Sequence, residues 1–154
     1  MATLGPSAKY FEDFAPGDEF LTQGRTIGAA DNTIWTMFSG DMNPMHVDDE
    51  YAREHGLFGG VFPAGLMVVA VASGLQERLG LFNGTGLAML NQSIDYHKAV
   101  LLNDTIRERM TVEECVKSKS RAAGRVTFRY EIIRQNDDVC VSGNVTYYLL
   151  GKEG

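Results

Sequence analysis

The residues with the clearest chemical potential lie in one short loop, where Asp41 and His46 are five positions apart. Pro44, which lies between them, removes a backbone donor and disfavours helical backbone at Asn43. The pattern predicts a bent loop that turns a carboxylate and an imidazole toward a common point. Such a pair can hold a water molecule and move its proton, because one partner accepts while the other donates. We therefore predict that Asp41 and His46 are catalytic.

A second candidate feature follows at Pro63-Ala64-Gly65, where a long apolar helix is expected to begin. The first turn of a helix leaves its backbone N–H groups without partners inside the helix. These groups, together with the helix dipole, stabilise negative charge near the N-terminus of the helix. We predict that the Gly65 N–H stabilises charge that develops on an oxygen of the substrate.

The same residues also have purely structural interpretations. Asp41 can end one helix, His46 can begin a turn, and Asn43 is expected to shape the loop beside the substrate. The acidic run at residues 48–50 suggests a metal, but carboxylates at a helix start explain it. A calcium loop is a poor match, since its sixth position would be His46 instead of glycine. We expect no metal site.

Three helices are expected to position these groups. The first begins near Ala30-Asp31, with Ile34, Trp35 and Phe38 as its buried stripe. The second runs from residue 48 or 49 to His55. The third covers residues 65–79, and its first half is apolar on every face, which predicts that protein surrounds it.

Most of the remaining chain has the pattern of β-strands. One strand is expected over residues 19–27, and four more over 87–97, 104–116, 124–135 and 139–150, separated by turn residues. Alternation is clear at Val126, Phe128, Tyr130 and Ile132, which have polar or charged residues between them. About five antiparallel strands with one central apolar helix predict an α+β fold.

Length and composition exclude several classes of protein. The 154 residues fit one domain, which we place at residues 10–154 after a loose tail at 1–9. A net charge of −6 argues against nucleic-acid and anionic-membrane partners.

The longest apolar run is too short to span a bilayer, and the first residues lack a secretion signal. The two cysteines make no disulfide framework. We expect a cytoplasmic protein.

These motifs together resemble a known family. The sequence is similar to the hydratase signature of MaoC-like dehydratases, the (R)-specific enoyl-CoA hydratases, at Ser39-Gly40-Asp41-x-Asn43-Pro44-x-His46-x-Asp48, Ala52, Phe58 and Gly65-Leu66. The family usually has His-Gly where this chain has Ala64-Gly65. The resemblance implies a hot-dog fold, an antiparallel sheet wrapped around the central helix. It also implies a homodimer that joins two sheets edge to edge, which would cover edge strands that are otherwise unpaired.

The resemblance implies reversible addition of water to a trans-2-enoyl thioester, carried by coenzyme A or by acyl carrier protein. The product would be an (R)-3-hydroxyacyl thioester, formed without a cofactor. Asp41 and His46 would hold the water, and the thioester oxygen would face the Gly65 N–H. Asn43, Ala64 and Met67 would lie at the substrate. Met37, Met42, Met45 and Met67 either pack in the core or form an adaptable wall for the acyl chain.

Two rival functions stay open at this point. One is a non-catalytic domain that binds acyl thioesters, altered at Ala64. The other is a hot-dog thioesterase, which usually carries a carboxylate on or near the central helix. Residues 66–74 contain no acid, and Glu77 lies at the far end of that helix, so hydrolysis is the weaker alternative.

Overall fold

The computed structural model describes residues 5–152. Part of the expected tail, residues 1–4, lies outside the described residues. Lys9, in the rest of that segment, donates its backbone N–H to the Leu81 carbonyl at 2.9 Å. No helix among residues 5–152 has the length and apolar character to cross a bilayer. Cys115 and Cys140 are both free thiols.

The sheet is antiparallel and has seven strands in five rows. Its path is β1-β5-β6-β7-β3, while β2 also pairs with β5 and β4 with β7. The bounds are β1 (Glu19–Leu21), β2 (Arg25–Thr26), β3 (Gly86–Gln92), β4 (Asp95–Tyr96), β5 (Thr105–Lys117), β6 (Ala123–Arg134) and β7 (Val139–Leu150). The expected strands over 19–27 and 87–97 are each split in two, and the other three form as expected within one residue at each end.

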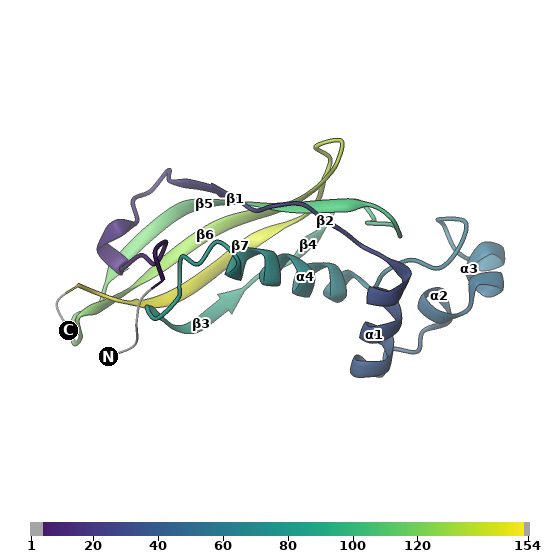
Figure 1. Ribbon diagram of the computed structural model, residues 1–154, viewed down its shortest axis with the longest axis horizontal. Helices are drawn as coiled ribbons and strands as arrows, with labels where there is room; N and C mark the ends of the chain where they lie inside the picture. Colours follow the sequence, from purple (N-terminus) through teal and green to yellow (C-terminus); the bar gives the residue numbers. More distant parts are fainter. Residues whose placement is uncertain (1–4, 153–154) are drawn as a thin grey trace.

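The helices occupy two places relative to this sheet. A short 3-10 helix, η1 (Phe11–Asp13), precedes β1, and the α-helices are α1 (Ala29–Ser39), α2 (Pro44–Val47), α3 (Asp49–His55) and α4 (Gly65–Glu77). Figure 1 shows α4 lying along one face of the sheet, while α1, α2 and α3 form an arm beyond the end of the sheet near the start of α4. The α+β, hot-dog prediction is confirmed.

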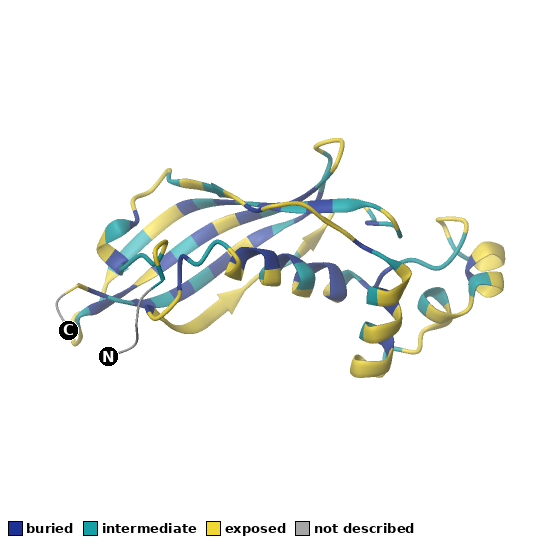
Figure 2. Ribbon diagram, in the orientation of Figure 1, coloured by how far each residue is buried: buried dark blue, intermediate teal, exposed yellow. Residues whose placement is uncertain are grey.

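The core lies between α4 and the sheet, because every second side chain of the long strands points inward. Val126, Phe128, Tyr130 and Ile132 are at most 1% exposed, which confirms the alternation expected for β6. They share one apolar cluster with the inward face of α4, including Val68, Ala72 and Leu75. The alternation appears as dark blue bands across β5, β6 and β7 in Figure 2.

The expected buried stripe of α1 is wrong for two of its three residues. Ile34 is 68% and Phe38 86% exposed, and α1 buries Asn32 and Thr36 instead; Trp35 is partly buried against the core. The opposite side of the helix packs on α2, where the Asn32 amide donates to the His46 carbonyl. Ile34 and Phe38 instead line an open groove between α1 and α4. Leu66 on α4 is likewise 59% exposed, so one chain alone does not surround the central helix.

Candidate active site

The imidazole of His46 is held in one orientation by the chain segment just before α4. His46 lies in α2, and its Nδ1 is 2.8 Å from the carbonyl oxygen of Phe62. A carbonyl can only accept a hydrogen bond, so Nδ1 carries the proton and Nε2 of the neutral ring has a free lone pair. The ring also contacts the Phe62 ring edge to face, at 5.1 Å between centroids. His46 is therefore oriented as a proton acceptor.

Asp41 faces the free nitrogen of His46. Its Oδ2 is 3.9 Å from Nε2, and the Asp41 side chain is 41% exposed against 11% for His46. Gly40 ends α1 in the left-handed conformation at φ 74°, which turns the chain toward Asp41. The separation is too long for a direct hydrogen bond and suits a water molecule that contacts both groups. The structure thus brings the two predicted catalytic residues together.

Asn43 and Asn32 fix the backbone around this pair. Asn43 caps α2 by accepting the Met45 N–H at 3.0 Å, and Pro44 occupies the first helical position. Asn32 of α1, which is 6% exposed, donates its amide to the His46 carbonyl at 2.8 Å. Asn43 therefore has the geometry of a loop-shaping residue. Asn32 gave no signal in the sequence, because its role depends on how α1 packs on α2.

The acidic run after His46 is occupied by helix capping and ion pairs. Asp48 accepts the Tyr51 N–H at 3.0 Å, and Asp49 accepts the Val61 N–H at 3.0 Å. Arg53 forms ion pairs with both Asp49 and Glu50. The Asp49 contact also ties α3 to the segment that leads into α4.

Gly65 borders an apolar cavity at the start of α4. The cavity has a volume of about 260 Å³ and is lined by Phe58, Phe62, Pro63, Gly65, Val68, Tyr96, His97, Lys98, Ala99, Val100 and Val141. The Tyr96 ring lies over Gly65, so a Cβ atom at this position would stand 2.6 Å from Tyr96 Cε1. A side chain at this position would therefore require the Tyr96 ring to move.

His46 borders a different hollow, of about 390 Å³, whose lining includes Met37, Met42, Val47 and Val61. Phe62 lies between the Gly65 cavity and the hollow beside His46. Its ring lines the Gly65 cavity, while its carbonyl and its ring contact His46. Within one chain, Gly65 and His46 therefore lie on opposite sides of Phe62.

Neither of the remaining two candidates lines either hollow. Ala64 is 4% exposed and belongs to the core. Met67 lines a groove between α1 and α4, together with Trp35 and Phe38. Met67 thus faces the α1 side of the central helix, whereas Gly65 faces Tyr96.

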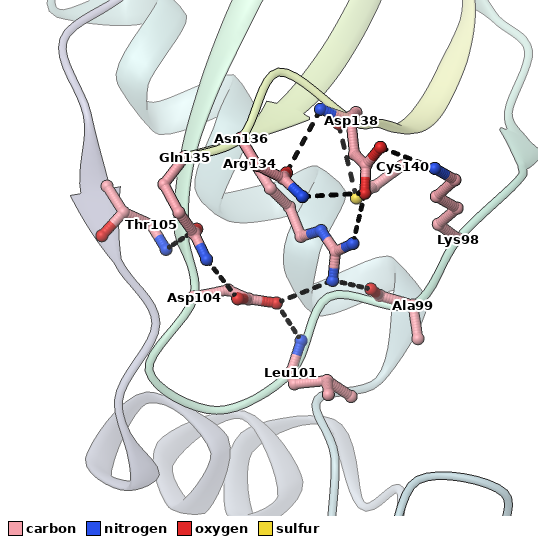
Figure 3. A network of polar contacts seen from close by, with 10 residues as sticks. All are labelled: Lys98, Ala99, Leu101, Asp104, Thr105, Arg134, Gln135, Asn136, Asp138 and Cys140. Atoms are coloured by element: carbon pink, nitrogen blue, oxygen red, sulfur yellow. Dashed lines mark hydrogen bonds and ion pairs between the residues drawn. The ribbon is translucent and has the colours of Figure 1, made fainter.

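A polar network holds the chain segment that forms one wall of the Gly65 cavity (Figure 3). Arg134 contacts Asp104 at 3.4 Å and Asp138 at 2.6 Å, and Lys98 contacts Asp138 at 2.6 Å. Hydrogen bonds from Lys98, Arg134 and Asn136 hold the pKa of Asp138 well below its usual range. Lys98, which lines the cavity, is therefore anchored to the β6–β7 turn.

Glu108 is a buried acid that the sequence motifs did not single out. It is 3% exposed on β5, and its Oε2 has no hydrogen-bond partner among residues 5–152. Burial raises its pKa to about 7. The sequence did indicate that Glu108 is buried, because it falls in the alternating series of inward residues Ile106, Met110 and Val112.

Comparison with known proteins agrees with this architecture. A family model described as MaoC like domain matches residues 12–136. The chain is 31% identical over 123 residues to Protein MaoC of Klebsiella aerogenes, an alignment that covers 78% of this chain and 35% of that protein. It is 28% identical over 122 residues to an (R)-specific enoyl-CoA hydratase of Rhodospirillum rubrum, covering 77% of this chain and 79% of that protein.

One solved structure extends the likeness to three dimensions. The MaoC-like dehydratase from Rhodospirillum rubrum has a TM-score of 0.85 and 25% identity, and the alignment covers 95% of this chain and 99% of that chain. The chain thus spans about a third of the Klebsiella protein but nearly the whole length of this structure.

Proposed function

This chain belongs to the MaoC-like domain family, and from that premise we propose that it adds water reversibly to a trans-2-enoyl thioester of coenzyme A. The product would be the (R)-3-hydroxyacyl thioester. The similarity to an (R)-specific enoyl-CoA hydratase supports this reaction class. The observation that carries the proposal is the 3.9 Å separation between Asp41 Oδ2 and His46 Nε2, with Nε2 free to accept a proton.

In the proposed mechanism, one water molecule donates hydrogen bonds to both Asp41 and His46. Its oxygen forms a bond to C3 of the enoyl group as one proton passes to the pair. The C2–C3 π electrons move toward the thioester carbonyl, whose oxygen gains negative charge. The pair then returns a proton to C2, so that it is unchanged after each turnover. The Asp41 carboxylate stabilises the imidazolium that His46 becomes in between.

The Gly65 N–H would oppose the charge that grows on the thioester oxygen. It lies in the first turn of α4, where the backbone N–H groups have no partner in the helix and the helix dipole is favourable. The apolar cavity beside Gly65 would exclude water, which strengthens a hydrogen bond to a growing charge.

We also infer that two copies of the chain associate. All seven residues of β3 are exposed, although β3 is the last strand on its side of the sheet path. An edge strand with exposed Leu87, Met89 and Leu90 is a surface that proteins usually cover. Pairing of β3 with β3 of a second copy would give hydrogen-bond partners to the backbone groups of this edge. The second copy can also complete the site between the Gly65 and His46 hollows.

The test is hydration of crotonyl-CoA, followed by the loss of enoyl-thioester absorbance. We expect turnover, with a product that an (R)-specific and not an (S)-specific 3-hydroxyacyl-CoA dehydrogenase oxidises. Release of free thiol without hydration would identify a thioesterase. Saturable binding without either reaction would identify a non-catalytic binding domain, and each of these results would overturn the proposal.

A further inference from the structure

We propose that the hydroxyl of Tyr96 is a second hydrogen-bond donor to the thioester carbonyl, beside the Gly65 N–H. This inference rests on the proposed function, because it concerns the same carbonyl oxygen. It assigns a contact with substrate to a residue that neither the sequence motif nor its loop contains.

The position of Tyr96 is fixed by the sheet. Tyr96 ends β4 and pairs with Val141 of β7, which sets the direction of its side chain. The far end of the ring lies at the start of α4: from the place that a Cβ on Gly65 would take, Cζ is 2.8 Å and the hydroxyl oxygen 3.1 Å away. The hydroxyl is therefore beside the residue whose N–H is proposed to bind the carbonyl.

The Tyr96 hydroxyl is free to bind a ligand. Two buried tyrosines have partners, since Tyr130 donates to the Ser93 carbonyl at 2.7 Å and the Tyr147 hydroxyl accepts from Gln76 at 2.8 Å. The Tyr96 hydroxyl forms no hydrogen bond within residues 5–152. Burial raises the pKa of Tyr96 above its usual value of 10, so the group is a protonated donor at neutral pH.

The surroundings of Tyr96 favour a single polar contact. Most residues that line the cavity are apolar or aromatic, including Phe58, Phe62 and Val68. The charged residue of the lining, Lys98, is ion-paired with Asp138 at 2.6 Å. A hydroxyl beside Gly65 at the start of the helix can contact a carbonyl oxygen that already faces the helix. Two fixed donors stabilise the growing charge better than one.

The decisive variant is Tyr96→Phe, because the ring still covers Gly65 and only the hydroxyl is lost. For crotonyl-CoA hydration we expect kcat to fall roughly 10²-fold, the lower end of the loss for one such donor, with KM nearly unchanged. Tyr51→Phe is the matched control, since Tyr51 is also exposed by about half and lies on α3, outside the cavity. It should keep normal kcat, and both variants should keep the thermal midpoint of the wild type.

A second readout does not depend on turnover. Butyryl-CoA has no double bond to hydrate, and its carbonyl, labelled with ¹³C, can be observed by infrared difference spectroscopy when bound. Each hydrogen bond lowers the carbonyl stretching frequency. We expect the frequency in the wild type to lie below that in Tyr96→Phe, while Tyr51→Phe should match the wild type.

The two readouts separate this inference from the proposed function. If the wild type hydrates crotonyl-CoA and Tyr96→Phe keeps its kcat or its carbonyl frequency, the Tyr96 proposal is wrong and the function stands. If the wild type does not hydrate it, the function fails, and the infrared shift alone decides on Tyr96. Equal frequencies, or no binding of butyryl-CoA, would then overturn the Tyr96 proposal as well.

Discussion

A carbonyl oxygen cannot donate a hydrogen bond, and this simple fact assigns the tautomer of His46. Because Nδ1 donates to Phe62, the nitrogen that faces Asp41 carries no proton in the neutral ring. Asp41 and Nε2 are then both acceptors, and a water molecule between them can satisfy both. The chemistry of the pair thus depends on a backbone atom 16 residues away, which no motif in the sequence includes.

Glu108 leads to a prediction about pH at the scale of a single residue. Its pKa is raised from 4.5 to about 7 in the folded protein, so folding favours the protonated form. Stability should therefore be highest below the unfolded pKa, fall as pH rises from about 4.5 to 7, and stay lower above that range. At pH 8 this pKa shift lowers the free energy of unfolding by about 3 kcal/mol. Glu108→Gln cannot ionise, so it should restore part of that stability.

Urea unfolding at pH 5 and pH 8, at one protein concentration, measures the effect. We expect Glu108→Gln to be more stable than the wild type by about 1–3 kcal/mol at pH 8 and similar to it at pH 5. Glu114→Gln, an exposed position on the same strand, should show no such difference. A constant difference between the Glu108 variant and the wild type at both pH values would contradict the account.

Residue types and spacing were enough to select Asp41 and His46 as a pair, because the loop between them is local. Phe62, Asn32 and Tyr96 were not selected, since each acts through a contact made by tertiary packing. An aromatic residue in a strand pattern most often indicates core packing, and nothing in the sequence places Tyr96 over Gly65. The sequence therefore predicted which two residues come together, and it did not predict the residues that surround them.

At the scale of elements, the start of α4 is built around the contact between Gly65 and Tyr96. Gly65→Ala adds a Cβ that would collide with the end of the Tyr96 ring. Tyr96 is 54% exposed, so the ring can move outward and the stability should change by less than about 1 kcal/mol. Hydration should still fall, by about 10²-fold, because the carbonyl site is displaced.

Gly74→Ala is the control on the same helix, since a Cβ at Gly74 meets no atom within 4 Å. It should keep normal crotonyl-CoA hydration. Paired measurements of kcat and urea unfolding check both variants. Normal kcat in Gly65→Ala would mean that the contact between Gly65 and Tyr96 has no part in the site.

The long strands were predictable because their alternation is regular, and β7 begins and ends where the sequence indicated. The breaks in the two other expected strands were not predictable from the sequence. The expected strand over 19–27 divides where Thr22 bonds to Glu108 of β5. The expected strand over 87–97 divides at residues 93–94, where the Ser93 N–H donates to the Asn144 carbonyl of β7. Both breaks are set by the neighbouring strand. The exposed side of α1 was also mispredicted, because periodicity shows which residues share a face and not which face is covered.

At the scale of the whole molecule, the exposed apolar residues indicate how copies associate. We expect sedimentation equilibrium at micromolar concentration to give twice the 16.9 kDa mass of the chain. Leu90→Lys places a charge on the proposed β3 interface and should shift the mass toward the monomer. Leu21→Lys is the matched control, because Leu21 is 49% exposed and Leu90 52%, but Leu21 lies on β1 at the opposite edge.

The Leu21 variant should remain a dimer. A wild type that is monomeric under these conditions, or a Leu90→Lys variant that dimerises as well as the wild type, would contradict pairing through β3. If Leu21→Lys alone dissociates the dimer, the interface lies at the β1 edge instead.

The most direct test of the central claim is the rate of crotonyl-CoA hydration by the wild type, Asp41→Asn, His46→Gln and the double variant. Asp41→Asn keeps the shape and hydrogen-bonding capacity of the side chain, and His46→Gln keeps a polar side chain. Both substitutions remove proton transfer. Each single variant should lose a factor of ~10² to 10⁴ in turnover. The double variant should be little worse than either, because the two residues act on one water. Thermal midpoints should stay close to that of the wild type. Near-normal turnover in either single variant, or losses that multiply in the double variant, would contradict a catalytic pair.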